Sequence, residues 1–421
     1  MDVPNAASRV IPPVRKREIF GWCCFDFGNS AFTTIVITVV GLPYFKAVVA
    51  GGANGAEGWW GTTLALSQLC VLLLAPLVGV VADVHARKKR YLAVTAIVCS
   101  VATALMCGIE AGQVGLMLAL LLVANVAFSM SENICSAFLP EISTSQNVGR
   151  ISGYGWSFGY LGGLLSLIIA LVIIQSGEGR AQWTFLAVGL FFFGASLPTL
   201  LLLKERAQPR ALLPGQTYRQ LAWKQFGDMR RELPQHRTLL RFFGAMTCYL
   251  AGLMAVVGFA AGYATEVIGM EQTQIIGLFV VLQIAGVAGA FGFGFFQDRL
   301  GPKIPLIIAL ILWIIACGWA AVCDSVTEFY GIGVLAGVGM GSLQSASRAV
   351  VSTLTPVGRS GEFFGYWGFF AKLAAMIGIF VFGHLVSLTD YRVAITVIAG
   401  FFLVGLLILI PLKLPRARRD P

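Results

Sequence analysis

The sequence predicts an all-α membrane protein in which twelve transmembrane helices form two pseudo-symmetric six-helix bundles. Three observations lead to this fold class: the composition, the number of long apolar runs, and a loop that occurs once in each half. Hydrophobic residues make up 57% of the 421 residues and charged residues only 12%, about half the charged share of a typical soluble chain. Soluble domains, disordered chains, collagens and small disulfide scaffolds are therefore excluded.

The apolar runs give the number of spans. A helix that crosses roughly 30 Å of hydrocarbon needs about 20 apolar residues. Backbone in lipid must satisfy its own hydrogen bonds, and the runs lack the alternation of an outer-membrane barrel, so we expect helices. Twelve runs fit, near residues 20–45, 59–82, 91–110, 114–138, 151–175, 183–203, 241–264, 273–297, 303–323, 328–352, 362–386 and 392–412.

The positions of the basic residues predict the orientation. With an even number of spans, both termini and the loops on their side of the membrane carry twenty-six of the 30 Lys and Arg residues. Because loops with excess positive charge stay in the cytoplasm, we expect both termini there, in the plasma (inner) membrane if the protein is bacterial. The net charge of +10 then reflects topology and anionic lipid headgroups, and no nucleic-acid partner is expected.

A long basic segment divides the chain into three parts. We predict an N-terminal six-helix bundle over 1–203, a cytoplasmic linker over 204–240 and a C-terminal six-helix bundle over 241–421. In the linker, Tyr218, Ala222, Phe226 and Met229 recur at helical spacing among basic residues. This pattern predicts an amphipathic helix over 216–231 that lies on the membrane surface as a tether, or alternatively binds a protein partner.

The two halves repeat one loop. Gly79 and Asp83 follow the second span, and Gly294 and Asp298 follow the eighth, with the same offset of 215 residues at both positions. A glycine lets two helices approach closely, and an aspartate can interact with the positive N-terminal end of a neighbouring helix. We therefore assign gating roles to this loop and to the deeper Arg348, with the residues Asp83, Arg87, Asp298, Arg299 and Arg348.

The duplicated loop, the six-plus-six spans and the basic linker resemble the major facilitator superfamily of secondary transporters. Shorter segments are similar to its vacuole-effluxer family, related to autophagy amino-acid exporters: FDFGNSAF at 25–32, AFLPE at 137–141, GWSFGYLGG at 155–163, QSASR at 344–348 and EFFG at 362–365, followed by Lys372. The chain departs from the family at Ala251–Gly252, where members usually carry an acidic residue before the glycine.

The resemblance implies a central cavity walled by spans 1, 4, 5, 7, 8, 10 and 11 and alternating access by rocking of the bundles. It also implies export of amino acids or similar small polar solutes, driven by protons. From the residues alone we expect a small solute with a charged or polar group. A monomer is expected.

Three ionisable side chains lie inside predicted spans. At 1.5 Å per residue, Asp26 lies roughly 12 Å, Glu132 about 10 Å and Lys372 about 16 Å from the cytoplasmic end. Charges in hydrocarbon are costly and mark a transport pathway or a structural pair. We predict that Lys372 receives a substrate carboxylate or an internal acid, and that Asp26 and Glu132 couple transport to protons. A static ion pair between the halves is the alternative.

Neutral polar and aromatic residues near mid-span complete the predicted substrate site. Each of them could instead join helices or pack in the core. The predicted substrate-binding residues are Asn29, Asn133, Trp156, Tyr160, Gln283, Gln344 and Lys372.

The sequence contains no enzyme motif in the structural context that its chemistry needs. The pentapeptide at 155–159 matches G-x-S-x-G but sits in an apolar helix instead of a strand-turn-helix, and the chain contains no phosphate-binding P-loop. The nine cysteines form no C-x-x-C pair. We expect neither an enzyme nor a metal or other cofactor. Two alternatives to a polar solute stay open: an amphiphilic or lipid-like substrate, and a non-transporting receptor that acts through the linker.

Overall fold

The computed structural model describes residues 14–53, 55–177, 179–208 and 214–414, and this part of the chain contains helices and no β-strand. Eleven helices are long and apolar enough to cross a membrane, and a bent pair supplies a twelfth span. The eleven are α3 (Ala56–His85), α4 (Lys88–Leu105), α5 (Val114–Ser136), α7 (Val148–Gln175), α8 (Trp183–Leu202), α10 (Arg237–Glu266), α11 (Gln272–Leu300), α12 (Lys303–Val322), α13 (Val326–Leu354), α14 (Ser360–Leu388) and α15 (Tyr391–Leu409). The predicted spans are confirmed.

The first span is bent. It consists of α1 (Lys16–Ala31), the π-helix η1 (Phe32–Val39), the short α2 (Gly41–Tyr44) and a second π-helix, η2 (Phe45–Val49). The parts before and after Val40 meet at 47°. A Cβ atom on Gly41 would overlap the carbonyl oxygen of Val36, so only glycine fits the bend. Wide π-helical turns are uncommon and often occur at functional sites.

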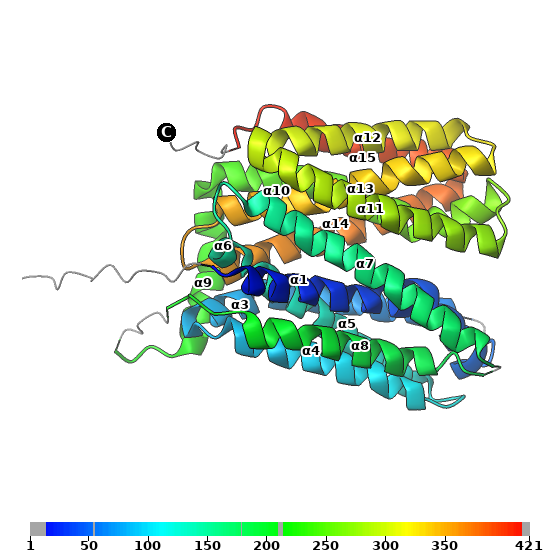
Figure 1. Ribbon diagram of the computed structural model, residues 1–421, viewed down its shortest axis with the longest axis horizontal. Helices are drawn as coiled ribbons and strands as arrows, with labels where there is room; N and C mark the ends of the chain where they lie inside the picture. Colours follow the sequence, from blue (N-terminus) through cyan, green and yellow to red (C-terminus); the bar gives the residue numbers. More distant parts are fainter. Residues whose placement is uncertain (1–13, 54, 178, 209–213, 415–421) are drawn as a thin grey trace, which may run out of the picture.

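The spans form two groups, α1–α8 and α10–α15, that lie side by side (Figure 1). Each group has a hydrophobic core of its own. Phe32 and Phe185 belong to the first core, and Phe242 and Trp313 to the second. We call these groups the N-bundle and the C-bundle; together they are the two six-helix bundles that the sequence predicts.

Two pairs of helices hold the bundles together, α3 with α14 and α7 with α11. Glycines bring the backbones into contact in both pairs. A Cβ atom on Gly79 of α3 would overlap the carbonyl oxygen of Gly361, and one on Gly153 of α7 would lie 2.5 Å from the carbonyl oxygen of Ala290. Small residues allow such close packing between membrane helices.

The linker contains the helix α9 (Tyr218–Glu232), which agrees with the helix predicted over 216–231. It lies across one end of the bundles (Figure 1) and packs against α3, where Leu221 contacts Val80 and Val84. The Tyr218 ring lies 4.0 Å from the His85 ring, centroid to centroid. The side chains of Ala222, Phe226 and Met229 lie outside the described residues.

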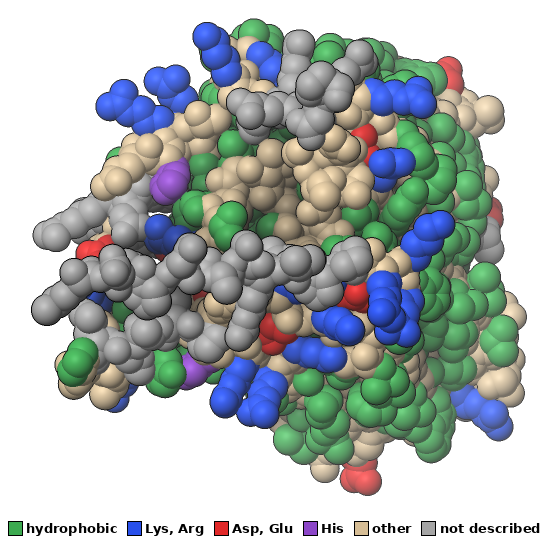
Figure 2. Space-filling model, turned by 60° about the vertical axis from the view of Figure 1, so that its left-hand side comes forward, with side chains coloured by type: hydrophobic (Ala, Val, Ile, Leu, Met, Phe, Trp, Pro, Cys, Tyr) green, Lys and Arg blue, Asp and Glu red, His purple; other side chains and the backbone are tan. Residues whose placement is uncertain are grey.

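The end of the molecule where α9 and the short α6 (Leu139–Ile142) lie is called here the linker end, and the opposite end the far end. The helix α1 begins and α15 ends at the linker end (Figure 1). Lys and Arg side chains gather there, as Figure 2 shows with that end turned forward. The structure therefore places the described parts of the basic loops at one end of the bundles.

Candidate functional site

At the linker end, Asp83 of α3 lies against the first turn of α14 in the opposite bundle. Its Oδ1 accepts a hydrogen bond from the Gly361 N–H and its Oδ2 accepts one from the Glu362 N–H, each at 2.9 Å. The Asp83 side chain is buried. The first turn of a helix presents unpaired N–H groups and the positive end of the helix dipole, which stabilise a carboxylate.

Lys88, at the start of α4, supplies the positive charge beside Asp83. Its Nζ lies 3.7 Å from Asp83 Oδ1, forms an ion pair with Glu141 and donates a 2.7 Å hydrogen bond to Ser360 Oγ of α14. The Lys88 side chain is 1% exposed. Charges from which water is excluded interact more strongly than charges at a surface. We call these residues and the first peptide groups of α14 the Asp83 cluster.

The second copy of the loop makes the reverse contact. Asp298, at the end of α11, accepts hydrogen bonds from the Gly149 N–H at 2.8 Å and the Arg150 N–H at 3.2 Å in the first turn of α7. Arg150 Nε also donates to Asp298 Oδ2 at 2.7 Å, and the Arg150 side chain is 42% exposed. In this Asp298 cluster, as in the first, an aspartate of one bundle binds a helix N-terminus of the other.

The basic residues that contact the two aspartates are not the arginines to which the sequence analysis assigns gating roles. Arg87 and Arg299 are exposed, whereas Lys88 and Arg150 contact the aspartates. The run of four basic residues at 87–90 marked the correct loop, but its sequence does not show which member is buried. Arg150 is the one basic residue of its loop, and nothing in the sequence around it indicated that it contacts Asp298.

Deeper between the bundles, Arg348 of α13 crosses to the N-bundle. Its Nη1 donates a 2.7 Å hydrogen bond to Asp26 Oδ2 of α1, so the two side chains form an ion pair. Its Nη2 donates to the Ser152 carbonyl oxygen of α7 at 3.1 Å. The Arg348 side chain is 2% exposed and that of Asp26 10%. Asp26, which the sequence analysis assigns to proton coupling, is thus paired with Arg348.

Aromatic rings and a glycine enclose this ion pair. The Arg348 guanidinium lies 4.5 Å from the centroid of the Trp22 ring and 5.3 Å from that of Trp156, distances at which a cation is attracted to an aromatic face. A Cβ atom on Gly155 would overlap both the Asp26 carboxylate and the Arg348 guanidinium. Gly155 therefore makes room for the two charged groups.

Glu132 of α5 and Lys372 of α14 lie on opposite bundles. They are close enough for their charges to act on each other, and Glu132 also lies within the influence of Asp26 and Arg348. Both side chains are partly exposed. Within the described part of the chain, neither makes a hydrogen bond or an ion pair shorter than 4.0 Å. These two predicted site residues are therefore near each other but share no hydrogen bond and no ion pair.

Neutral residues of the predicted site also face the other bundle. Tyr160 of α7 donates a 2.7 Å hydrogen bond to Gln344 Oε1 of α13. A Cβ atom on Gly163 of α7 would overlap the amide of Gln283, which places the Gln283 side chain of α11 against α7. Asn29 is buried in α1, and no contact described for it crosses to the C-bundle.

Three nitrogen donors are buried without an acceptor among the described residues: Asn133 Nδ2, Trp156 Nε1 and Trp367 Nε1, the last in the core of the C-bundle. Asn133 of α5 packs against α14, because a Cβ atom on Gly368 would overlap its amide. Trp367 precedes that glycine. An unpaired buried donor costs about 1–3 kcal/mol, and such groups in a folded protein call for a ligand, a water or a role in function.

A large apolar cavity lies within the C-bundle. Its cavity volume is about 120 Å³, within about 900 Å³ of non-atom space that includes open solvent, and residues of all six C-bundle helices line it. The lining is hydrophobic apart from Gln283 and Tyr263, and the Tyr263 hydroxyl donates its proton to the Ala320 carbonyl oxygen. This cavity therefore offers an apolar surface with two polar groups, the amide of Gln283 and the indole N–H of Trp313, which has no acceptor among the described residues.

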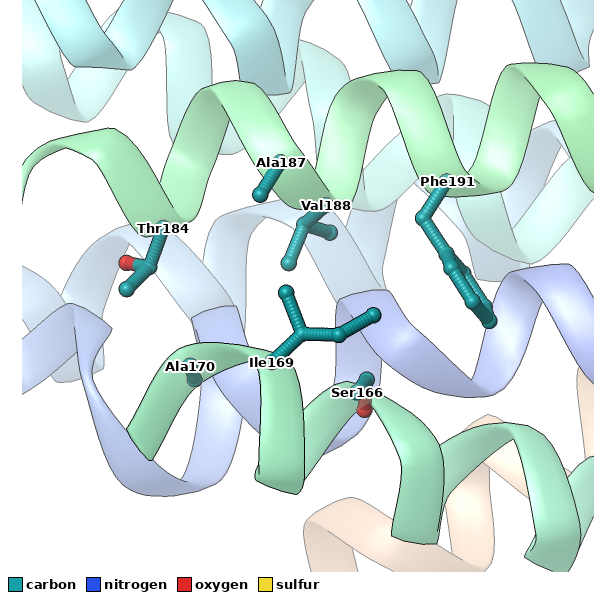
Figure 3. A pocket seen from close by; sticks show the side chains of 7 residues that line it. All are labelled: Ser166, Ile169, Ala170, Thr184, Ala187, Val188 and Phe191. Carbon is teal, nitrogen blue, oxygen red and sulfur yellow. The ribbon is translucent and has the colours of Figure 1, made fainter. Parts of the chain in front are cut away.

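A much smaller pocket, with a volume of about 10 Å³, lies between α7 and α8 and holds at most about one water molecule. Figure 3 shows the α8 side chains Thr184, Val188 and Phe191 facing Ser166 and Ile169 of α7. The Ser166 and Thr184 hydroxyls donate to backbone carbonyls of their own turns. The pocket holds none of the charged groups above and lies within the N-bundle, away from the contact between the bundles.

The first residues of the linker contact the Asp83 cluster. Glu205 accepts hydrogen bonds from the first two N–H groups of α4 at 2.5 and 3.4 Å, the shorter one from Lys88. Burial raises the pKa of Glu205 and outweighs the lowering effect of these hydrogen bonds. The Arg206 N–H donates to Glu141 at 2.9 Å, and its guanidinium pairs with Glu18 of α1 at 2.9 Å. Among the described residues, no group of three His, Cys, Asp or Glu side chains could hold a metal ion.

Comparison with known proteins places the chain in a family. The family model described as "Vacuole effluxer Atg22 like" matches residues 60–148 and 143–421. The chain belongs to the Atg22-like vacuole effluxer family. It is therefore an integral, multi-pass membrane protein of the major facilitator type, as the motifs in its spans indicate.

Two relatives illustrate the range of this family. The uncharacterized MFS-type transporter YxiO of Bacillus subtilis is 22% identical over 405 residues, which are 92% of this chain and 93% of YxiO. Autophagy-related protein 22-1 of Penicillium rubens is 25% identical over 296 residues, 64% of this chain and 50% of that protein. The matched region thus spans about half the length of the fungal relative.

Solved structures with the same fold include two transporters. The human organic anion transporter MFSD10 (TETRAN) superposes with a TM-score of 0.76 at 15% identity, over 94% of this chain and 99% of the other. A bacterial homologue of the iron transporter ferroportin, in an outward-facing state, gives a TM-score of 0.71 at 16% identity, over 94% and 98%. These likenesses establish the major facilitator fold of the Atg22-like protein.

Proposed function

We propose that this Atg22-like protein is a secondary active transporter that exports a small zwitterionic, amino-acid-like solute by alternating access, with protons as the coupling ion. One observation carries the proposal. Glu132 and Lys372 have opposite charges, lie on opposite bundles and have no hydrogen-bond or ion-pair partner in the described part of the chain. The family description as an effluxer supports export.

A zwitterion offers each of these two groups the partner that it lacks. Its ammonium group would bind Glu132, and its carboxylate would bind Lys372. A charge at membrane depth costs at least a few kcal/mol unless it is paired or hydrated, so both contacts are favourable. A solute held in this way touches both bundles, and its affinity therefore depends on their relative position, which alternating access requires.

The unpaired donors support a carboxylate in the same region. The Asn133 amide and the Trp156 indole are N–H groups without an acceptor among the described residues. A carboxylate has several acceptor sites, whereas a purely cationic solute would leave these donors unpaired. Tyr160, Gln283 and Gln344 would contact the rest of the solute, and Asn29 lies one turn from Asp26.

Proton coupling is assigned to Asp26 and Glu132. Protonation of Asp26 would remove the charge that holds Arg348 and would weaken the contact between α1 and α13. Protonation of Glu132 would release the ammonium group of the solute. Each step links a proton to a change that transport needs. The coupling assignment predicts that Asp26→Asn and Glu132→Gln transport without dependence on a pH gradient; unaltered dependence in both variants would refute it.

The orientation and the gate follow from the linker end. We infer that this end is cytoplasmic, because loops rich in Lys and Arg stay there. The Asp83 and Asp298 clusters and the Asp26–Arg348 pair join the bundles from this end inward. Opening toward the cytoplasm would have to break all three, while the far end closes. We expect a monomer to complete this cycle.

Solute flux into liposomes that contain the purified protein tests the proposal. Candidate solutes come from a thermal-shift screen of amino acids, peptides, sugars and lysolipids, because a ligand that binds the folded protein raises its melting temperature. Lys372→Ala and Glu132→Gln should each reduce flux of a zwitterionic solute at least tenfold. Lys413→Ala, which removes an exposed lysine at the linker end, serves as the matched control.

The alternative of a non-transporting receptor gives a different result. In that case the liposomes would show no flux above protein-free liposomes for any solute, and a cytosolic partner would bind to residues 204–241. Wild-type affinity for the solute in Lys372→Ala would instead remove this lysine from the site while leaving transport intact. The two outcomes separate an error about the function from an error about the residue.

A further inference from the structure

The cavity of the C-bundle has the size and lining of a ligand site. Its cavity volume of about 120 Å³ is close to that of an apolar cavity of about 150 Å³ that binds benzene, and ligand pockets are mostly apolar with a few placed polar groups. The ring of Phe329 and the side chains of Leu278 and Ala316 are among its walls. A water molecule in this cavity would find too few hydrogen-bond partners on the apolar walls. The cavity is therefore better suited to a hydrocarbon group.

One edge of the cavity adjoins the contact between the bundles. Gln283, which lines the cavity, lies against Gly163 of α7. Met340, another lining residue, is one helical turn before Gln344, which accepts the hydrogen bond from Tyr160. Both residues belong to the C-bundle and touch or neighbour the N-bundle. The cavity therefore runs from the surface between the bundles into the interior of one of them.

Aromatic packing closes the cavity on other sides. Phe259 and Phe382 stack at 4.7 Å between centroids, and the rings of Tyr263 and Phe329 are parallel at 5.6 Å. All four rings line the cavity. The rings give a rigid wall, and the Tyr263 hydroxyl is already bonded to a backbone oxygen. The polar groups of the lining that have no described partner are then the amide of Gln283, at the edge near the N-bundle, and the indole N–H of Trp313.

We propose that this cavity binds the apolar chain of a single-chain amphiphilic carboxylate, whose polar end lies between the bundles. The chain would enter past Gln283 and Met340 and lie against Phe259 and Phe329. The substrate class then extends to amphiphilic carboxylates whose apolar group has at least the size of a benzene ring. Whether the bound amphiphile is transported rests on the proposed transport function. Whether the cavity binds it is tested by binding measurements alone.

Straight-chain carboxylates from butanoate to dodecanoate are the probes, added to the full-length protein in nanodiscs, with protein-free nanodiscs as the blank. Wild-type affinity should rise about fourfold for each added methylene group until the cavity is filled. Ala316→Phe fills the cavity and should abolish this dependence on chain length. Ala288→Phe adds the same ring to an exposed position of α11 outside the lining and should behave as wild type.

A second filling variant, Ala260→Leu on α10, guards against misfolding of Ala316→Phe, and its effect should be in the same direction. Equal affinity for butanoate and dodecanoate in the wild type would overturn the inference. So would a phospholipid that native mass spectrometry finds retained by wild type and Ala288→Phe but lost from Ala316→Phe, because the occupant would then be a membrane lipid rather than a solute.

Lys372→Ala separates this inference from the proposed function. If Lys372 binds the carboxylate, this variant should weaken short and long chains by the same factor and keep the dependence on chain length. A loss of chain-length dependence in Ala316→Phe alone supports the cavity site whether or not Lys372 binds the head group. Weaker binding in Lys372→Ala with no effect of chain length in wild type supports the polar site and overturns the cavity.

Discussion

The Asp83 and Asp298 clusters join the bundles through the same backbone contact but with different cations. Lys88 is 1% exposed, lies near two carboxylates and reaches Ser360 in the opposite bundle. Arg150 is 42% exposed and pairs with Asp298 alone. Removing one partner of a buried pair costs about 3–5 kcal/mol because a charge is left uncompensated, whereas an exposed pair contributes about 0.2–1 kcal/mol. The two copies of the loop are therefore similar in sequence, but the Lys88 contacts stabilise the protein more than the Arg150 contact does.

The linker contacts only the stronger of these clusters among the contacts described. Glu205 binds the backbone N–H of Lys88, and the Arg206 N–H binds Glu141, the acid that pairs with Lys88. A movement of the linker would thus change the contacts of both the backbone and the side chain of Lys88. The two contacts between the bundles therefore differ in their connections: the Asp83 cluster contacts the linker, and the Asp298 cluster has no described contact with it.

The largest effect is expected for Lys88→Met. Loss of the ammonium group leaves Asp83 and Glu141 buried without a cation, and the protein should lose about 3–5 kcal/mol of stability. Thermal unfolding in detergent, followed by tryptophan fluorescence, measures the change. Arg87→Met removes an exposed charge from the adjacent position and should shift stability by less than about 0.5 kcal/mol. Equal losses in the two variants would contradict the difference in burial.

The paired glycines provide a steric comparison. A Cβ atom on Gly79 would overlap the Gly361 backbone oxygen, while one on Gly294 would lie 2.9 Å from the Gly149 oxygen. Gly79→Ala should therefore cost about 1–3 kcal/mol through overpacking and favour separation of α3 from α14, with a smaller effect for Gly294→Ala. Modification of cysteines introduced at the linker end reports the separation. A larger effect of Gly294→Ala would reverse the ranking.

Arg150→Gln should have a small effect on stability. The exposed ion pair contributes at most about 1 kcal/mol, and Asp298 keeps both backbone hydrogen bonds from the first turn of α7. Unfolding measured at low and high salt checks this, because salt screens the exposed pair. The wild type should lose more stability with added salt than the variant does. A loss as large as that of Lys88→Met would show that exposure does not rank the two cations.

The smallest effect is expected for Glu205→Gln and depends on pH. Because the folded pKa of Glu205 is raised, its protonated form stabilises the fold below the ordinary pKa, and this contribution is lost as the pH rises through the folded value. The glutamine keeps an acceptor for the Lys88 N–H and should remove that loss. Melting temperatures of both proteins from roughly pH 4 to 7 give the comparison; parallel curves would argue against titration of Glu205.

Periodicity and composition predicted the spans, the linker helix and the loops that carry the two aspartates, because these depend on residues close in sequence. The 47° bend at Val40 was not predicted, since π-helical and α-helical turns have the same apolar composition here. The pairing of Asp26 with Arg348, and the burial of Lys88 instead of Arg87, depend on how helices rotate against each other. The cavity arises from six helices together, which no single segment encodes.

The two aspartate contacts are reciprocal: each bundle gives a carboxylate and receives one at a helix N-terminus. A six-helix ancestor could have made both contacts with a second copy of itself, using one loop twice. The same reciprocity means that residues 1–203 and 241–421, produced as separate chains in one cell, carry complementary surfaces for reassembly. The linker is then needed less for the two bundles to recognise each other than for the hydrogen bond between Glu205 and the Lys88 N–H.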